Sequence, residues 1–324
     1  MHRLGRSGLK VSELCLGCMS FGEPLRGGHP WTLPKEESRL LLRQAIEAGV
    51  NFLDTANVYS DGSSEEIMGD VLWQMVRRDE VVLATKVHGA MLSEPQMSGL
   101  SRRSILHNID ASLKRLRTDH VDLYQTHRWD NDTPIEETME ALHDVVKSGK
   151  ARYIGASTMW AWQFAKAQEV ARANGWTPFV SMQNQINLLY REEEREMIPL
   201  CVDQGVGLIP WSPIARGKLA RPAGVQTDRT GKDKYMAYLF DKAAEADARV
   251  ISAVQVLAAE LGRPMAQVAL AWVRQKAGVA APIIGVTKPE QLTEALAGLD
   301  LVLTQGQIAA LEAPYIPHAP LGQE

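Results

Sequence analysis

The sequence predicts an α/β protein, a closed (β/α)8 barrel of eight parallel strands with helices outside, of the TIM-barrel class. Short apolar runs alternate with helical patterns over almost the whole chain, which is typical of a parallel sheet. Eight such runs occur in one series, and 324 residues is a size at which barrels commonly fold as one unit. We therefore expect residues 1–324 to form a single domain.

The eight expected strands are short apolar runs, several of which end in or next to polar residues. They are Leu14–Gly17, Val50–Asp54, Val81–Lys86, Val121–Thr126, Tyr153–Ser157, Val180–Gln185, Gly207–Pro210 and Pro282–Val286.

Helix ends between these strands are also recognisable. Ser63 with Glu66, and Thr133 with Glu136, have the spacing of capping boxes, and Pro134 falls where a first helical residue is expected. One apolar stripe is formed by Ile105, Ile109, Leu113 and Leu116. Gly149 and Gly205 follow helical patterns and predict helix ends that turn into the next strand.

Two segments depart from the alternation. The polar stretch Arg3–Lys10 contains Gly5 and Gly8 and predicts an N-terminal hairpin that closes the bottom of the barrel. The segment Ala215–Ala246 predicts a long loop after the seventh strand, and long loops in compact proteins are usually functional or mobile.

Composition excludes several classes of function. Hydrophobic residues make up 45% and charged residues 23%, which indicates a globular protein with a large core. The net charge of -4 does not indicate nucleic-acid binding. The N-terminus has no long apolar segment, and Val279–Val286 is too short to span a bilayer. We expect a cytoplasmic protein that binds neither membrane nor nucleic acid, with its oligomeric state left open.

Cys15 and Cys18 form a Cys-x-x-Cys pair, but the pair lies where a strand runs into a loop. Zinc needs about four ligands, and redox pairs usually open a helix. Simple packing is therefore expected, without a metal site.

Active sites of this fold lie at the C-terminal ends of the strands. Three consecutive strands carry ionisable residues there: Asp54 ends the second and leads to Tyr59, Lys86 ends the third, and His127 follows the fourth. Singly, each is more simply explained as a structural ion pair or a satisfied polar group. Together, at three successive strand ends, they predict a catalytic site.

Their chemistry is mutually consistent. A tyrosine is a poor acid near neutral pH unless a nearby cation favours its phenolate, which Lys86 can do. Asp54 can hold the ammonium group, and His127 can hydrogen-bond the oxygen that accepts the proton. This arrangement predicts a proton-donating site without a nucleophile.

At these residues the sequence resembles the aldo-keto reductases. The segments that carry the resemblance are Asp54–Tyr59, Ala84–Lys86, Leu123–Asp130, Ser7–Ser12, Leu16–Gly22, Gly155–Ser157, Ile209–Pro213 and Pro282–Gly285. The resemblance covers nearly the entire chain. It implies an enzyme that reduces aldehydes or ketones with hydride from a nicotinamide, through the catalytic tetrad Asp54, Tyr59, Lys86 and His127.

The resemblance also implies a cofactor site. Ser157 and Gln183 match positions that hold the nicotinamide carboxamide, and Trp211 matches the aromatic residue that stacks on its ring. The loop over the pyrophosphate is matched by Ser212, Ile214 and Gly217, and the segment at the adenosine end by Gly285, Lys288 and Gln291.

Three positions depart from the family pattern at this site. Thr158, Gln291 and Ala295 stand where an Asn, an Arg and an Asn are often found. NADP(H) is the expected cofactor, held at its 2′-phosphate mainly by Lys288, and NAD(H) is the alternative.

Substrate residues are predicted at Trp31, Arg128 and Trp129, which would suit a small carbonyl compound, sugar-derived or phosphorylated. Within the family, Trp31–Pro34, Ser60–Glu66 and Tyr190–Glu196 resemble a bacterial branch linked to 1-deoxyxylulose 5-phosphate metabolism. Two alternatives stay open: a nicotinamide-binding regulatory subunit with slow turnover, and a sugar-phosphate converting enzyme that uses the Lys86 amine.

Overall fold

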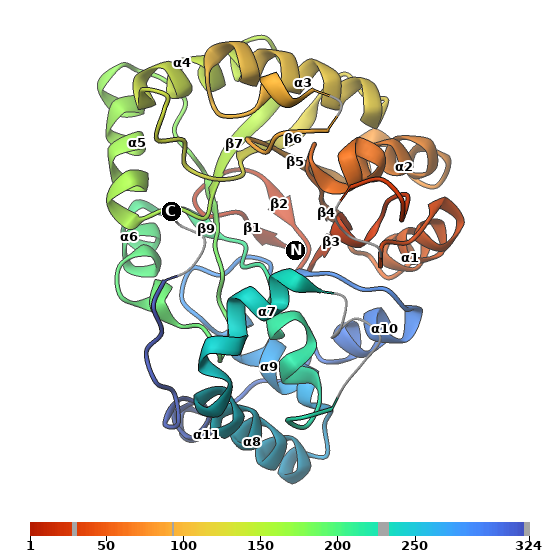
Figure 1. The fold of residues 1–324 in the computed structure, drawn as a ribbon, viewed down its shortest axis with the longest axis vertical. Helices are drawn as coiled ribbons and strands as arrows, with labels where there is room; N and C mark the ends of the chain where they lie inside the picture. Colours follow the sequence, from red (N-terminus) through yellow and green to blue (C-terminus); the bar gives the residue numbers. More distant parts are fainter. Residues whose placement is uncertain (28–30, 93, 226–232, 321–324) are drawn as a thin grey trace.

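Eight parallel strands form one curled sheet surrounded by helices in the computed structural model of the chain, as Figure 1 shows. The structure describes residues 1–27, 31–92, 94–225 and 233–320. The parallel strands are β3 (Cys15–Gly17), β4 (Phe52–Asp54), β5 (Val82–Val87), β6 (Val121–Thr126), β7 (Ala151–Ser157), β8 (Ser181–Gln183), β9 (Gly207–Leu208) and β10 (Ile283–Ile284).

The strand order is β10-β3-β4-β5-β6-β7-β8-β9, so chain neighbours pair and β10 returns to the first strand of the sheet. Isolated bridges join Leu208 to Val279 and Trp211 to Ile283, and they close the sheet between its first and last strands. The predicted (β/α)8 barrel is confirmed. Most strands are one to three residues shorter than expected, because several apolar runs continue beyond the hydrogen-bonded ladder.

The helices surround this sheet. They are α1 (Lys35–Glu47), α2 (Ser63–Val71), α3 (Arg102–Leu116), α4 (Ile135–Lys147), α5 (Ala161–Ala173), α6 (Met197–Gln204), α7 (Lys234–Phe240), α8 (Ala244–Leu261), α9 (Met265–Arg274), α10 (Pro289–Ala297) and α11 (Gln305–Glu312). In the parts of the chain that the structure describes, no helix is long and apolar enough to cross a membrane.

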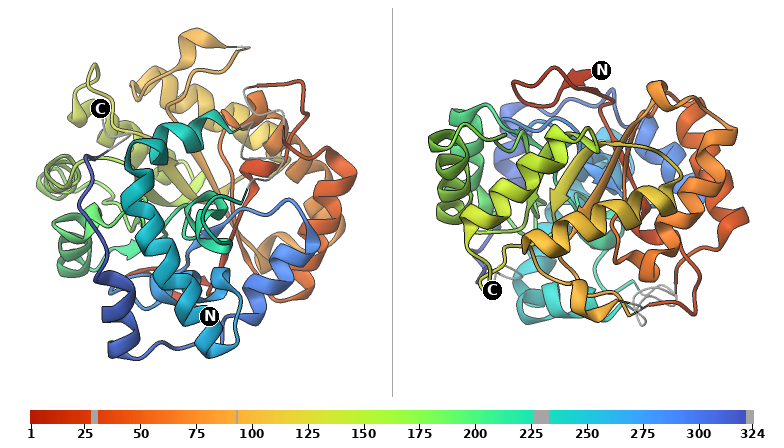
Figure 2. Two further views of the ribbon diagram at one scale, coloured as in Figure 1. Left: turned by 60° about the horizontal axis from the view of Figure 1, so that its bottom comes forward. Right: turned by 90° about the horizontal axis from the view of Figure 1, so that it is seen from above.

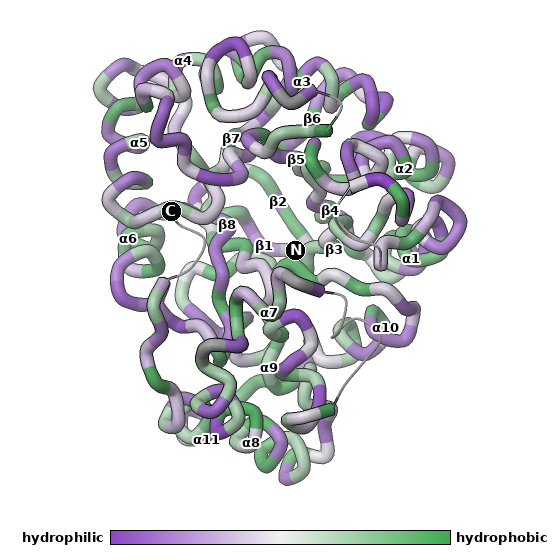
Figure 3. The backbone as a smooth tube through the Cα atoms, viewed as in Figure 1, coloured by the Kyte–Doolittle hydropathy of each residue, from purple (hydrophilic) through white to green (hydrophobic). Residues whose placement is uncertain are grey.

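Helix α3 illustrates how sequence fixes these elements. Ser101 caps its N-terminus by accepting a hydrogen bond from the Ser104 backbone N–H, and Arg117 ends it in the left-handed conformation. The four residues of the predicted stripe are all buried against the sheet. Figure 3 shows the same division along the tube, with hydrophobic segments toward the barrel and hydrophilic ones outside.

Both predicted capping boxes are wrong. The Ser63 hydroxyl accepts a hydrogen bond from the Glu23 backbone instead, and Glu66 forms an ion pair with Arg26. The Thr133 hydroxyl donates to Asp130, and Pro134 is the N-cap of α4, not its first residue. In each case a partner elsewhere in the chain competes successfully with the local helix end.

The predicted N-terminal hairpin is present as β1 (His2–Arg3) and β2 (Lys10–Val11). Its turn lies against β9, where Arg6 N–H donates to the Gly205 carbonyl, and a Cβ at Gly5 would lie 2.4 Å from that oxygen. Leu4 packs with Phe52 and Leu123 inside the barrel. The right view of Figure 2 shows this hairpin at one end of the barrel, opposite α7.

The segment Ala215–Ala246 is not the continuous loop that the sequence predicts. It contains a 3-10 segment (Ala215–Ala220), helix α7 and the start of α8, while residues 226–232 lie outside the described part of the chain. The Arg216 guanidinium forms a buried ion pair with Asp233, at 2.6 Å, next to the start of α7.

Cys15 and Cys18 are free and fully buried, and burial raises the pKa of both thiols. Cys15 faces the barrel interior and Cys18 the layer between sheet and helices. Both therefore pack as small apolar side chains. No cluster of potential metal ligands is found among the residues that the structure describes.

Asp247 of α8 is a buried carboxyl group, 2% exposed, and neither oxygen has a hydrogen-bond partner within the described chain. Burial raises its pKa to about 7, while Lys218 acts in the opposite direction; His318 Nε2 lies 3.5 Å away. Because the pKa is higher when folded than when unfolded, the protein loses stability as the pH rises from about 4 to 7. Asp247→Asn is therefore expected to raise the melting temperature at pH 8 by about 3 °C, and by less at pH 5. An equal shift at both pH values, measured by calorimetry, would contradict this.

Candidate active site

Side chains alternate across each strand, and the inward positions continue into the C-terminal mouth of the barrel. In β4, Phe52 faces the interior and Leu53 the helices, so Asp54 faces inward. By the same alternation of side chains, Lys86 faces inward on β5 and Gln125 faces inward on β6. The register pairs Lys86 with Gln125 and brings these polar groups to one level.

Lys86 is the centre of the site. Its Nζ donates hydrogen bonds to Asp54 Oδ2 at 2.5 Å, to the Thr55 carbonyl at 2.9 Å and to the Tyr59 hydroxyl oxygen at 3.2 Å. The side chain is fully buried, so three acceptors compensate for the loss of hydration. The geometry links the carboxylate to the phenol through one ammonium group.

Tyr59 reaches this position from a tight loop after β4. The next two residues, Ser60 and Asp61, have φ values of 46° and 49°, a left-handed conformation that costs energy in residues other than glycine. Asp61 accepts a hydrogen bond from the Leu92 backbone, and Arg26 donates to the Asp61 carbonyl. These contacts hold the loop that carries Tyr59.

His127 lies across from Tyr59, with ring centroids 5.6 Å apart and the rings nearly perpendicular. Burial, together with Lys86 and Arg128, holds the pKa of His127 well below its usual value. The imidazole is therefore neutral at pH 7. A neutral imidazole can donate one hydrogen bond to a substrate oxygen.

Burial also raises the pKa of Tyr59, and Lys86 acts in the opposite direction without cancelling this effect. Lys86 thus lowers the pKa of Tyr59, as expected from the sequence, but the phenol remains protonated at neutral pH. For Lys86, burial alone would lower the pKa, but Asp54 and Tyr59 outweigh it and raise the pKa. The ammonium form is stable here.

The other carboxylate oxygen of Asp54, Oδ1, accepts hydrogen bonds from two uncharged side-chain amides. Gln125 Nε2 donates to Asp54 Oδ1 at 2.9 Å and Gln183 Nε2 donates to it at 3.0 Å. Ser157 in turn donates to the Gln183 carbonyl at 2.7 Å. Gln125 was not predicted, although the alternation Leu123, Gln125, His127 indicates it.

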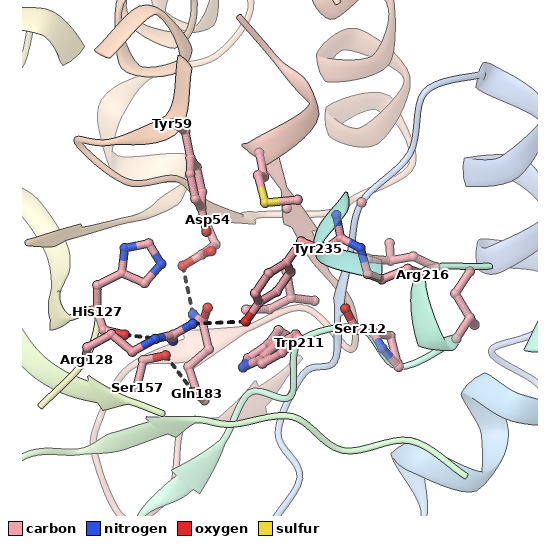
Figure 4. Close-up of a pocket in the computed structure, with 17 residues that line it drawn as sticks. Asp54, Tyr59, His127, Arg128, Ser157, Gln183, Trp211, Ser212, Arg216 and Tyr235 are labelled. Atoms are coloured by element: carbon pink, nitrogen blue, oxygen red, sulfur yellow. Dashed lines mark hydrogen bonds between the residues drawn. The ribbon is translucent and has the colours of Figure 1, made fainter. Parts of the chain in front are cut away.

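These groups open into a cavity that Figure 4 shows in close-up. Its walls combine hydrogen-bonding groups with aromatic rings. The cavity is lined by Gly17, Met19, Asp54, Tyr59, His127, Arg128, Ser157, Gln183, Trp211, Ser212, Pro213, Ile214, Arg216, Tyr235, Ile283, Ile284 and Gly285.

A second cavity adjoins the first, with Ile214, Arg216, Ile284 and Gly285 lining both. Of the predicted cofactor residues, Gly217, Lys288 and Gln291 line the second cavity, and Ile214 and Gly285 stand at the junction. A Cβ added at Gly285 would meet only the Gly17 carbonyl, at 3.9 Å. The glycine thus leaves open space between the two cavities.

The residues present fit a nicotinamide dinucleotide. The first cavity offers Trp211 as an aromatic surface and the Gln183 side-chain oxygen, which accepts no hydrogen bond from any described residue. The second offers two cations, Arg221 and Lys288, that have no carboxylate partner in the described chain. Between them the loop residues Ser212, Ala215 and Arg216 adopt positive φ.

The predicted substrate residues do not stay together. Arg128 lines the first cavity, but Trp31 lines the second, as Lys288 does. Trp129 lines neither and packs against Trp162, with ring centroids 6.1 Å apart. The expectation of a common substrate wall is therefore wrong, because the three residues do not line the same cavity.

Gln291 caps a helix, a role that was not predicted from the sequence. Its side-chain oxygen accepts hydrogen bonds from the backbone N–H groups of Thr287 and Lys288 and caps the start of α10. These two backbone N–H groups therefore already have an acceptor, the side-chain oxygen of Gln291.

Tyr235 and Arg221 were not predicted at all. Tyr235 enters the first cavity from α7, and its ring lies 6.4 Å from that of Trp211 and beneath the Arg216 guanidinium. Arg221 lines the second cavity. The only signal for either was the basic, glycine-rich start of the insert.

The barrel, the buried Asp–Lys–Tyr network and the two adjoining cavities are compatible with an oxidoreductase that uses a nicotinamide cofactor. Comparison with known families agrees: residues 13–316 match the model of the aldo/keto reductase family. The chain belongs to this family and is an enzyme.

Its relatives are named as reductases and aryl-alcohol dehydrogenases. The chain is 47% identical to versiconal hemiacetal acetate reductase of Aspergillus parasiticus over 98% of this chain and 97% of that one. It is 44% identical to a putative aryl-alcohol dehydrogenase of Schizosaccharomyces pombe over 97% and 95% of the two chains. An aldo-keto reductase of Alternaria alternata is 42% identical over 99% and 93%.

These relatives are fungal, and they give no support to the expected bacterial branch linked to 1-deoxyxylulose 5-phosphate metabolism.

Proposed function

We propose that this enzyme reduces aldehydes or ketones with NADPH, with Tyr59 as the proton donor. The observation that carries the proposal is the contact of the Lys86 ammonium with both Asp54 and Tyr59, at the mouth of the cavity that also contains His127. Bound NADPH supplies the hydride. Residues 1–324 act as one barrel domain, and three buried free thiols suit a reducing cytoplasm.

The protein groups divide the remaining work. His127, neutral, donates a hydrogen bond that orients the carbonyl oxygen, and the Tyr59 hydroxyl transfers its proton to that oxygen as negative charge develops there. Lys86 then stabilises the phenolate, and Asp54 keeps Lys86 charged and in place. Gln125 and Gln183 fix Asp54 through its other oxygen.

Two other functions are less compatible with this site. A lyase or isomerase that uses the Lys86 amine needs a neutral lysine, whereas Asp54 and Tyr59 hold the pKa of Lys86 above its usual value. A regulatory subunit has no need for a proton donor joined to a buried ion pair. An assay of NADPH oxidation with benzaldehyde, which yields benzyl alcohol, tests the proposal: turnover supports it, and its absence with both cofactors refutes it.

The substrate class is proposed from the relatives and from the cavity wall. The relatives are named for a hemiacetal acetate and for aryl alcohols. Trp211, Tyr235 and Met19 give the first cavity a wall that suits an aromatic ring.

We further propose that NADPH is preferred over NADH, mainly through Lys288. Arg221 adds a second cation to that cavity, while Glu37 and Glu294, which also line it, would repel a phosphate. Lys288→Ala is expected to lower the preference for NADPH by about tenfold to hundredfold, the value of one or two charge-assisted contacts. The measurement is the ratio of kcat/KM for the two cofactors.

Lys147→Ala is the matched control, because Lys147 is exposed at the end of α4, at the opposite end of the barrel. A parent enzyme that prefers NADH, or a ratio that Lys288→Ala leaves untouched, would show that the phosphate site is assigned wrongly.

A further inference from the structure

Arg128 is the one charged group of the first cavity whose charge is not balanced within the described chain. Its Nη1 donates to the His127 carbonyl at 3.1 Å and its Nη2 to the Tyr235 hydroxyl oxygen at 3.3 Å. No carboxylate of the described residues forms an ion pair with it. The guanidinium is partly buried, so its charge is only partly hydrated.

The other charges of this cavity are matched. Asp54 is paired with Lys86, and Arg216 is paired with Asp233. His127 is neutral at pH 7, for the reasons given above. The cavity that contains the proton donor therefore carries one uncompensated positive charge, at Arg128.

Arg128 also lies on the side of the cavity away from the adjoining second cavity. Figure 4 shows it beside His127, with Arg216 on the far side of Tyr235. Arg216 lines both cavities, whereas Arg128 lines only the first. The unmatched charge is thus next to the group that would orient the carbonyl oxygen, and remote from the end that suits the adenosine.

A guanidinium group with free N–H groups binds carboxylates through paired hydrogen bonds. Its two present acceptors, a backbone carbonyl and a phenol oxygen, are both neutral. The Tyr235 hydroxyl is also able to donate a hydrogen bond of its own to a nearby anion. Together they form a positively charged corner of a cavity that Trp211 and Met19 also line.

We propose that Arg128, with Tyr235, binds an anionic oxygen group of the substrate, so that the preferred substrates are aromatic carbonyl compounds that carry a carboxylate. The inference rests on the proposed carbonyl reduction and names its substrate class. Arg128 is a specificity-determining residue here, and the proton donor remains Tyr59.

The test compares 3- and 4-carboxybenzaldehyde with their methyl esters, which keep the ring and aldehyde but lack the charge. We expect the parent enzyme to have a higher kcat/KM for at least one acid than for its ester. Arg128→Met is expected to lower that acid-to-ester ratio by about tenfold to hundredfold, and Arg128→Lys is expected to retain part of it.

Arg152→Met is the matched control. Arg152 is exposed near the start of β7, at the opposite end of the barrel, where it donates only to the Gly149 carbonyl. The Arg152→Met variant loses the same charge as Arg128→Met. An equal loss of the acid-to-ester ratio in Arg152→Met would show that the effect comes from net charge and would overturn the proposal.

The outcomes separate this inference from the function on which it rests. If the esters are reduced but the parent shows no preference for either acid, the proposal fails while carbonyl reduction stands; this arm needs no variant to fold. If Arg128→Met weakens NADPH binding, measured by fluorescence titration, and leaves the acid-to-ester ratio unchanged, Arg128 serves the cofactor and the proposal is wrong. If no aldehyde is reduced at all, the proposed function itself fails.

Discussion

Tyr59→Phe is expected to lower the rate of carbonyl reduction by about two to four orders of magnitude, the usual cost of removing a general acid. The Lys86 ammonium contacts this hydroxyl at 3.2 Å, and it contacts no other O–H group of the residues that the structure describes. NADPH affinity should change little, since other residues line the parts of the cavities proposed for the cofactor. Steady-state rates with benzaldehyde and fluorescence titration with NADPH measure the two effects separately.

Tyr153→Phe provides the matched control. The Tyr153 hydroxyl lies near Gly8 of the N-terminal hairpin, at the other end of the barrel. Its removal should leave the rate near that of the parent. Substantial activity in Tyr59→Phe with a small aldehyde would mean that another group supplies the proton, with His127 the first candidate.

Lys86→Met is expected to abolish most activity and to shift the pH dependence of the reverse reaction, alcohol oxidation. That reaction needs the phenolate of Tyr59, whose pKa is already raised by burial and lowered in part by Lys86. Without the ammonium the pKa rises further, so the acid limb of the pH profile should move to higher pH. An unchanged limb with lower rates would mean that Lys86 only positions other groups.

Lys86→Met also leaves Asp54 as a buried carboxylate without its cation. Removal of one partner from a buried ion pair typically costs about 3–5 kcal/mol. The double variant Asp54→Asn/Lys86→Met removes both charges and keeps an amide oxygen that Gln125 and Gln183 can reach. It should therefore regain stability in thermal unfolding, while the acid limb stays shifted. If the double variant is no more stable than the single one, the ion pair does not account for the loss.

The barrel and the core of the candidate site were predictable because both follow from local periodicity. Strand residues alternate, so Asp54 and Lys86 on neighbouring strands had to face the same interior once the apolar residues before them did. Gln125 obeys the same rule, but an uncharged amide at a strand end does not by itself indicate a catalytic site. It carries no charge, yet it holds Asp54 as closely as Gln183 does.

What could not be predicted depends on contacts between distant segments. Helix α7 is only seven residues long and has no extended periodicity, and the residue that caps its N-terminus, Asp233, forms an ion pair with Arg216. Trp31 lines the second cavity, and the bridge between Phe21 and Leu33 joins two segments that lie on either side of it in the sequence. The capping boxes failed for the same reason, since Ser63 and Thr133 bond to groups outside their helices.

Transfer of deuterium from NADPH that carries deuterium at both positions of the reactive nicotinamide carbon tests the central claim most directly. With benzaldehyde, the parent enzyme should give benzyl alcohol that carries one deuterium at the carbinol carbon, at a rate that Tyr59→Phe lowers by about a hundredfold or more. Benzyl alcohol without deuterium, or equal rates of labelling in the parent and in Tyr59→Phe, would contradict hydride transfer coupled to proton donation by Tyr59.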